Sequence, residues 1–262
     1  ILTQDTKTAE RFLAALDSAD LCVMLLRFRE LPDADMKHFV AYLNRGQPII
    51  ALRTSTHAFA YKKNLQSPYA RFDWKNKDWP GGFGRQVLGE TWINHHGHHA
   101  KESTRAVVAK GQENNPIVKG CEDIWGPSDV YTVRLPQPEG CVPVLMGQVL
   151  EGMNPTDKPL AGATDPKKKN DPMMPVAWTK TYKGAGGKAS LVFTTTMGCS
   201  TSSSPTAEPD SARRTSIPKI PTPSPTPCCA VSASIRLARA ARASSRTLMT
   251  AAIPPAPDPL VG

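Results

Sequence analysis

The apolar positions near the start of the chain follow the pattern of a strand, a helix and a second strand. The run Ala19–Leu26 is almost continuously apolar, which is typical of a strand buried on both faces. Asp33 then stands where a helix N-cap is expected and Gly46 where a glycine follows a helix end. Between them, four apolar residues fall at helical spacing: Met36, Phe39, Val40 and Leu43. Pro48–Leu52 predicts a second buried strand.

A strand, a helix and a strand within about 35 residues make a βαβ unit, which favours a parallel sheet with covering helices. We therefore expect an α/β protein with three layers and a mainly parallel central sheet. Glu10–Leu16 predicts the end of a preceding helix. Further strands are expected at Thr104–Ala109, Val130–Leu135, Pro143–Leu150, Pro175–Tyr182 and Lys188–Thr196.

The composition changes abruptly after Gly198. No aromatic residue follows Phe193, and eleven of the 25 prolines lie beyond Gly198. A segment rich in Ser, Thr, Pro, Ala and Arg buries too little apolar surface to offset its ordering entropy. We therefore expect one domain over residues 1–198 and a tail over residues 199–262. The tail is either disordered or an out-of-frame translation of the coding sequence.

Charge and hydropathy exclude two classes of partner. The net charge is +9, but much of the excess lies in the tail, and the basic run Pro166–Asn170 is typical of a solvated loop. We expect no nucleic-acid partner and, since no apolar run reaches the length of a bilayer span, no membrane partner. The protein is expected to be soluble, either cytoplasmic or exported by a signal preceding Ile1.

The first candidate site is the loop that follows the Pro48–Leu52 strand. Ligands of parallel α/β sheets bind beyond the carboxyl ends of the strands, and polar side chains cluster there: Arg53, Thr54, Ser55, Thr56 and His57. The loop contains no cysteine, and no Gly-x-Ser-x-Gly motif surrounds Ser55, so acyl transfer is disfavoured. Arg53 is suited to orienting a ligand oxygen and His57 to handling protons. Alternatively, the hydroxyls cap a helix and His57 packs in the interior.

The second candidate is the sequence His-His-Gly-His-His at residues 95–99. Histidine carries protons near neutral pH and also binds metals. His95 and His96 are the expected acid–base residues. No metal is expected, but the alternative is a divalent ion such as zinc held by His57, His95 and His98. A third interpretation is that this segment is an exposed or structural loop with no catalytic role.

The third candidate is the aromatic-rich segment Ser67–Gln86. Its aromatic residues alternate with charged ones, which suits a carbohydrate because sugars have apolar C–H faces and a polar rim. Asp73, Trp74 and Trp79 are the expected sugar-binding residues, together with Thr54 and Thr56 of the first loop. The same composition also suits an ordinary packed flap.

Four segments together resemble the ThuA-like (trehalose-utilisation) family: residues 48–59, 67–99, 115–120 and 175–182. The resemblance covers about Ala15–Gly198, and the block from Trp79 to His99 is its most specific part. It implies a flavodoxin-like fold of the class I glutamine amidotransferase type, with Arg53 at the position of the amidotransferase cysteine. It also implies a link to sugar catabolism.

The chain departs from the family pattern at three places. The family's first strand and helix have no counterpart, so we expect the amino-terminal βα unit to be missing. Val130 separates Asp129 from Tyr131 where an Asp-Glu pair is common, and Gly198 precedes Cys199 where many members have Gly-His. We therefore expect a domain that binds or acts on a sugar, with a non-catalytic binding module or a metal-dependent glycosyl-hydrolase-like enzyme as alternatives. The sequence leaves the substrate and the oligomeric state open.

Overall fold

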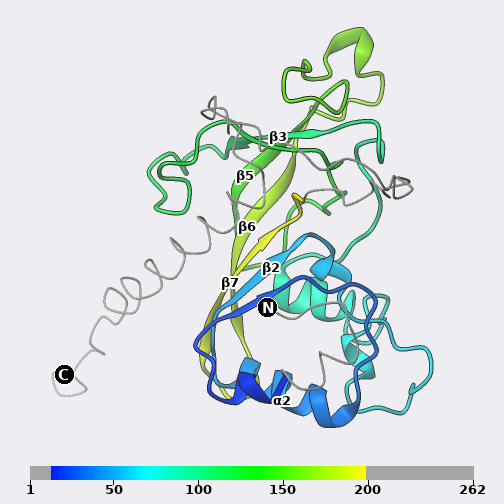
Figure 1. Cartoon of the computed structure of the whole chain (residues 1–262), viewed down its shortest axis with the longest axis vertical. Coiled ribbons are helices and arrows are strands. Elements are labelled where there is room, and N and C mark those ends of the chain that lie inside the picture. The colour runs from blue at the N-terminus through cyan, green and yellow to red at the C-terminus, as the bar shows by residue number, and fades with distance from the viewer. Residues whose placement is uncertain (1–12, 199–262) are drawn as a thin grey trace, which may run out of the picture.

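The computed structural model describes residues 13–198, so the predicted tail at 199–262 and the start of the predicted helix at Glu10 lie outside the described residues. Seven strands form one sheet in the order β1-β2-β7-β6-β5-β3-β4 (Figure 1). These are β1 (Cys22–Met24), β2 (Ile49–Leu52), β3 (Thr104–Val108), β4 (Ile124–Gly126), β5 (Cys141–Val149), β6 (Met174–Lys183) and β7 (Ala189–Thr195). The protein is therefore a mixed α/β structure.

The βαβ unit is present where the pattern predicts it. Helix α2 (Asp33–Asn44) connects β1 to β2, which pair in parallel. Pro32, not the expected Asp33, is the N-cap. Asp33 and Asp35 lie in the first turn, where their negative charges interact favourably with the positive end of the helix dipole. Gly46 adopts φ +72°, and a Cβ there would lie 2.7 Å from the Cβ of Lys188. Glycine is therefore required at this turn.

The prediction of a mainly parallel sheet is wrong. Only the pairs β1–β2 and β2–β7 are parallel, and the other four pairs are antiparallel. The reason is visible between β6 and β7, where Lys183 pairs with Ala189 across a five-residue loop, Gly184–Lys188. A parallel connection needs a crossover of a dozen or more residues, so this loop permits only a hairpin.

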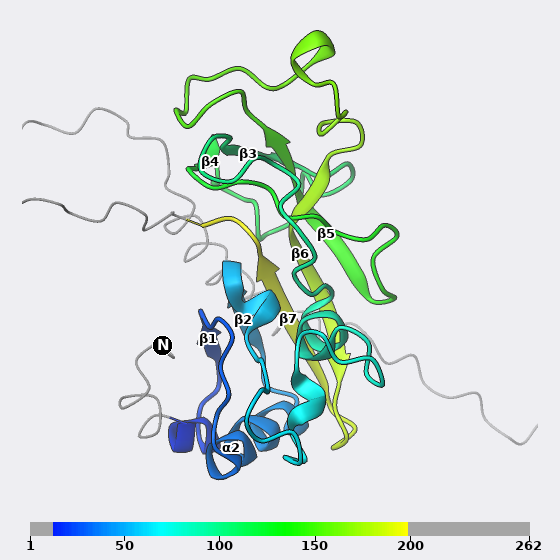
Figure 2. The ribbon, with the colours of Figure 1, turned by 90° about the vertical axis from the view of Figure 1, so that its right-hand side faces the viewer.

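The long strands β5, β6 and β7 form the middle of the molecule, and the loop between β5 and β6 projects at one end (Figure 2). Of the strand predictions, Val130–Leu135 is wrong, because this segment forms only one isolated bridge, between His95 and Tyr131. The short strand β4 was not predicted. The predicted helix end Glu10–Leu16 overlaps the 3₁₀ helix η1 (Leu13–Asp17).

The sheet is buried on both faces. Ile49 and Ala51 of β2 face a core that includes α2, η1 and the aromatic residues Phe59, Phe72 and Phe83. Ile50, between them, faces a second core built from β5, β6 and β7 and from the segments around Ile117 and Val130. Among residues 13–198, α2 is the only α-helix, so the second face is covered by irregular segments. The expected three-layer, flavodoxin-like arrangement is therefore not observed.

Three further short helices follow β2 along the chain: η2 (Arg53–His57), which lines the site described below, η3 (Ala70–Phe72) and the π-helix η4 (Gly84–Leu88). Helix η4 packs tightly on η2, since a Cβ on Gly84 would lie 2.0 Å from the carbonyl oxygen of Thr56. Within the described residues, no helix has the length and apolar character needed to cross a bilayer.

Candidate functional site: a pocket beyond the end of β2

A pocket of about 380 Å³ lies directly after the carboxyl end of β2. Its walls come from the segment after β1, from η2, from the loop that holds residues 95–99 (the histidine loop) and from residues 127–131. The lining residues are Arg27, Phe28, Arg53, Thr54, His57, Trp92, His95, His99, Ala100, Pro127, Ser128, Asp129 and Tyr131. The position agrees with the expectation that ligands bind beyond the carboxyl end of a parallel strand.

Three pocket residues have strained backbones. Arg53 has φ +41°, Phe28 has φ +50° and Ala100 has φ +59°, and none of them is glycine. A positive φ is unfavourable for residues with a side chain and persists where the surroundings enforce it, most often at functional sites. At Arg53 the turn directs the guanidinium from the end of β2 into the pocket floor.

The histidine loop is fixed to the segment around Val130 by backbone hydrogen bonds. The amides of His96 and Gly97 both donate to the carbonyl of Val130, at 2.9 and 3.1 Å. The amide of Thr132 donates to the carbonyl of Asn94 at 2.9 Å, next to the bridge between His95 and Tyr131. This pairing places the imidazoles of His95 and His99 beside Asp129.

Asp129 lies at the centre of the pocket floor, the part of the pocket formed by Asp129, His95 and His99. Its side chain is 1 % exposed, and its Oδ1 accepts hydrogen bonds from Arg53 Nη2 at 3.0 Å and from His99 Nδ1 at 2.9 Å. Its Oδ2 lies 2.6 Å from His95 Nδ1. Burial alone raises the pKa of this carboxyl, but Arg53 and the two histidines outweigh burial and lower the pKa below its usual value. Asp129 is therefore ionised at neutral pH.

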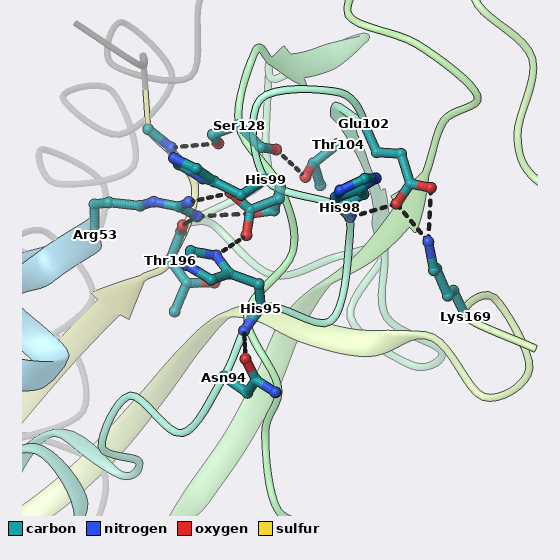
Figure 3. A network of polar contacts seen from close by, with 12 residues as sticks. Arg53, Asn94, His95, His98, His99, Glu102, Thr104, Ser128, Lys169 and Thr196 are labelled. Atoms are coloured by element: carbon teal, nitrogen blue, oxygen red, sulfur yellow. Dashed lines mark hydrogen bonds and ion pairs between the residues drawn. The ribbon is translucent and has the colours of Figure 1, made fainter. Parts of the chain in front are cut away.

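Arg53 links this carboxylate to the sheet. Its Nη1 donates to the carbonyl of Asp129 at 2.7 Å and to that of Thr196, directly after β7, at 2.5 Å. The guanidinium also lies 3.8 Å from the ring centroid of Tyr131, a cation–π contact. Figure 3 shows Arg53, Thr196, His95 and His99 gathered at this point, with His98 apart from them beside Glu102.

Aromatic rings form one wall of the pocket. The ring of His57 lies 4.8 Å from Phe28, 5.6 Å from Trp92 and 6.2 Å from Tyr131, measured between centroids. Trp74 stands behind them, 5.6 Å from Trp92 and 5.4 Å from Phe28. The pocket thus combines apolar ring faces with charged and hydrogen-bonding groups.

His57 is neutral in this environment. Burial is the main cause, and the nearby charges of Arg27 and Arg53 add to it, lowering the pKa of His57 to about 3. The Thr56 hydroxyl donates to the carbonyl of Arg53 and lies 3.2 Å from His57 Nδ1. Since that hydroxyl has a single hydrogen, we assign the His57 proton to Nδ1, which leaves a lone pair on Nε2. His57 is thus suited to accepting a hydrogen bond from a ligand hydroxyl.

The structure brings four of the predicted residues together in the pocket: Arg53, Thr54, His57 and His95. His96 points elsewhere, since its Nε2 bonds to the carbonyl of Lys169 at 2.7 Å. His98 is exposed, and its amide bonds to Glu102, so the predicted set of His57, His95 and His98 does not converge. Among the described residues, the metal-ligating side chains that do converge are His95, His99 and Asp129.

The other predicted sugar-binding residues lie outside this pocket. Thr56 is buried, and Trp79 packs against Phe72 with 5.3 Å between the ring centroids. Asp73 accepts hydrogen bonds from the amides of Tyr61 and Lys75, each at 2.7 Å. Asp73 and Trp74 line a neighbouring hollow of about 520 Å³ that shares Phe28 with the pocket.

Sequence reasoning missed six pocket residues that contribute charge or ring surface: Arg27, Phe28, Trp92, His99, Asp129 and Tyr131. In the sequence, Asp129 and Tyr131 stand out only as a departure from the family pattern, and the strand predicted at Val130–Leu135 gives no reason to place them in a pocket. His99 and Trp92 adjoin the predicted histidines in the sequence, but nothing in the local pattern shows which of these side chains point into the pocket.

No family model and no curated protein matches the chain. Among solved structures, the chain is similar to a crystal structure from Bacteroides uniformis described as a ThuA-like protein, with 14% sequence identity and a TM-score of 0.41. The match covers 75% of this chain and 66% of that one, so it spans slightly less than two thirds of the neighbour's length. At this level of likeness, membership of the ThuA-like family stays a prediction from the sequence motifs.

Proposed function

We propose that the chain binds a sugar or sugar derivative in the pocket beyond β2, as a ThuA-like domain of carbohydrate catabolism. The observation that carries this proposal is the pairing of an aromatic wall with a polar floor inside one cavity of about 380 Å³. A sugar ring presents C–H faces to aromatic rings and hydroxyls to polar groups, so both surfaces are matched.

Each side of the pocket has a distinct role in this proposal. Trp92 and Tyr131 face the apolar side of the ring. His57 accepts a hydrogen bond from one hydroxyl through Nε2. The floor of His95, His99 and Asp129 is the place where chemistry occurs, since two imidazoles on one carboxylate either exchange protons with it or bind an ion with it.

Trp92→Leu is expected to weaken sugar binding by about five- to thirtyfold, since a stacked ring and its contacts are worth on the order of 1–2 kcal/mol. The measurement is calorimetric titration of the full chain with trehalose, glucose and maltose. The matched control is Trp125→Leu, because Trp125 is also half-buried but lies on β4 and outside the pocket. The proposal fails if none of the three sugars binds at millimolar concentration, or if both variants bind them equally well.

Product analysis with the same sugars separates an enzyme from a binding module. In an enzyme, His95→Ala abolishes turnover while sugar binding persists, and His96→Ala leaves turnover intact because His96 faces away from the pocket. A binding module gives no product from the unaltered chain, and its sugar affinity survives both changes.

A further inference from the structure

We infer that His95, His99 and Asp129 bind one divalent transition-metal ion at the floor of the pocket. Three ligand atoms, one from each residue, lie within 4.8 Å of one another. Two imidazoles and one carboxylate are a frequent ligand set for zinc in hydrolytic enzymes and for other divalent ions of the first transition row.

The distances within the cluster suit an ion. His95 Nδ1 lies 2.6 Å from one oxygen of Asp129, and His99 Nδ1 lies 2.9 Å from the other. Two ligand atoms, each about 2.1 Å from one ion, stand roughly 3 Å apart at the right angle of an octahedral ion and roughly 3.4 Å apart at the angle of a tetrahedral one. Slight lengthening of these contacts makes room for one ion where the two imidazoles now contact the carboxylate. The side chain of His99 is 60 % exposed, so it has room to adjust toward an ion bound by His95 and Asp129.

The surroundings hold the carboxylate and leave room for a ligand. Arg53 bonds to Oδ1 of Asp129, and metal-binding carboxylates are commonly fixed by such an outer partner. Three backbone hydrogen bonds hold the histidine loop in place: the amides of His96 and Gly97 donate to Val130, and the amide of Thr132 donates to Asn94. Three protein ligands leave at least one coordination position open, and the cluster borders the cavity, so a ligand oxygen has access to the ion.

A second histidine is otherwise hard to explain at this carboxylate. One imidazole is enough for a proton-transferring pair with an aspartate, and His95 already has the shorter contact. His99 is mostly exposed, yet its Nδ1 also points at Asp129, at the cost of an ordered side chain. A shared ion accounts for both imidazoles.

The test is titration of the full chain with Co²⁺ and Zn²⁺ after treatment with a chelator, in the absence of sugar. We expect one equivalent of Co²⁺ to bind, with visible absorption bands of nitrogen and oxygen ligation. His99→Ala is the variant least able to disturb folding, because its side chain is mostly exposed. It and His95→Ala are each expected to weaken Co²⁺ binding by about tenfold or more.

The matched control is His98→Ala, which removes an imidazole from the same loop but leaves the cluster intact. The inference is overturned if no stoichiometric ion binds, or if His98→Ala weakens binding as much as His99→Ala. It is also overturned if the bound cobalt shows thiolate charge-transfer absorption that disappears when the cysteines are alkylated. Only the idea that a sugar oxygen occupies the open coordination position rests on the proposed function. A failed sugar titration therefore leaves the metal site unaffected, and a failed metal titration leaves the proposed sugar binding unaffected.

Discussion

Asp129→Asn is expected to lower the free energy of unfolding by about 3 kcal/mol, because it leaves a buried guanidinium without its counter-charge. The side chains of Asp129 and Arg53 are 1 % and 13 % exposed, so solvent replaces little of the lost interaction. The substitution keeps the size of the side chain and removes its charge. It therefore also weakens the acceptors that hold His95 and His99 in place.

The measurement is urea-induced unfolding of the variant and the unaltered chain at neutral pH. Asp123→Asn is the control, because Asp123 also pairs with an arginine, Arg105, but is 53 % exposed. An exposed ion pair contributes at most about 1 kcal/mol, so this control is expected to stay near the unaltered stability. If the two variants lose the same stability, Asp129 is not the buried centre of the pocket floor.

Trp178→Ala is expected to cost on the order of 4 kcal/mol, the largest loss of stability among single substitutions in the sheet. Trp178 is completely buried in β6, where it pairs with Pro143 of β5 and Thr194 of β7. Its indole nitrogen donates to the carbonyl of Leu88 at 2.7 Å, which joins the sheet to the end of η4. The truncation thus leaves a cavity and leaves the Leu88 carbonyl with only the longer hydrogen bond from the Thr194 hydroxyl, at 3.2 Å.

Thermal and urea unfolding of Trp178→Ala and Trp178→Phe check this expectation. Phenylalanine keeps most of the buried ring and loses the hydrogen bond, so its cost is expected to be about half that of alanine. Equal and small costs for the two variants contradict the burial of Trp178 between the sheet and the end of η4.

The βαβ unit was predictable because its evidence is local. The helical spacing of Met36, Phe39, Val40 and Leu43, and the glycine after the helix, lie within one short segment. The direction of the later strands was not predictable, because an apolar run buried on both faces has the same sequence pattern in parallel and antiparallel sheets. The length of the loop Gly184–Lys188 was the available signal, since only a hairpin fits it.

The sequence predicts only those site residues that lie within one short segment or directly after a strand. Arg53, Thr54 and His57 follow a strand end, a position that itself suggests a ligand site. Asp129 is 30 residues from His99 and 76 from Arg53, and only the folded chain brings the three together. Four histidines in one short loop predicted imidazole chemistry, but the backbone pairing with Val130 decides that His95 and His99 face Asp129.

The most direct test of the proposed sugar site is to observe the imidazole rings by NMR in the full chain with isotope-labelled histidine. The chain has six histidines, and three of them line the pocket: His57, His95 and His99. On addition of trehalose, glucose or maltose, we predict shifts in the signals of these three and none at His38, His96 or His98, each signal being assigned by substitution. Shifts confined to the second group, or no shift with any of the three sugars, would contradict the proposal that this pocket is the sugar site.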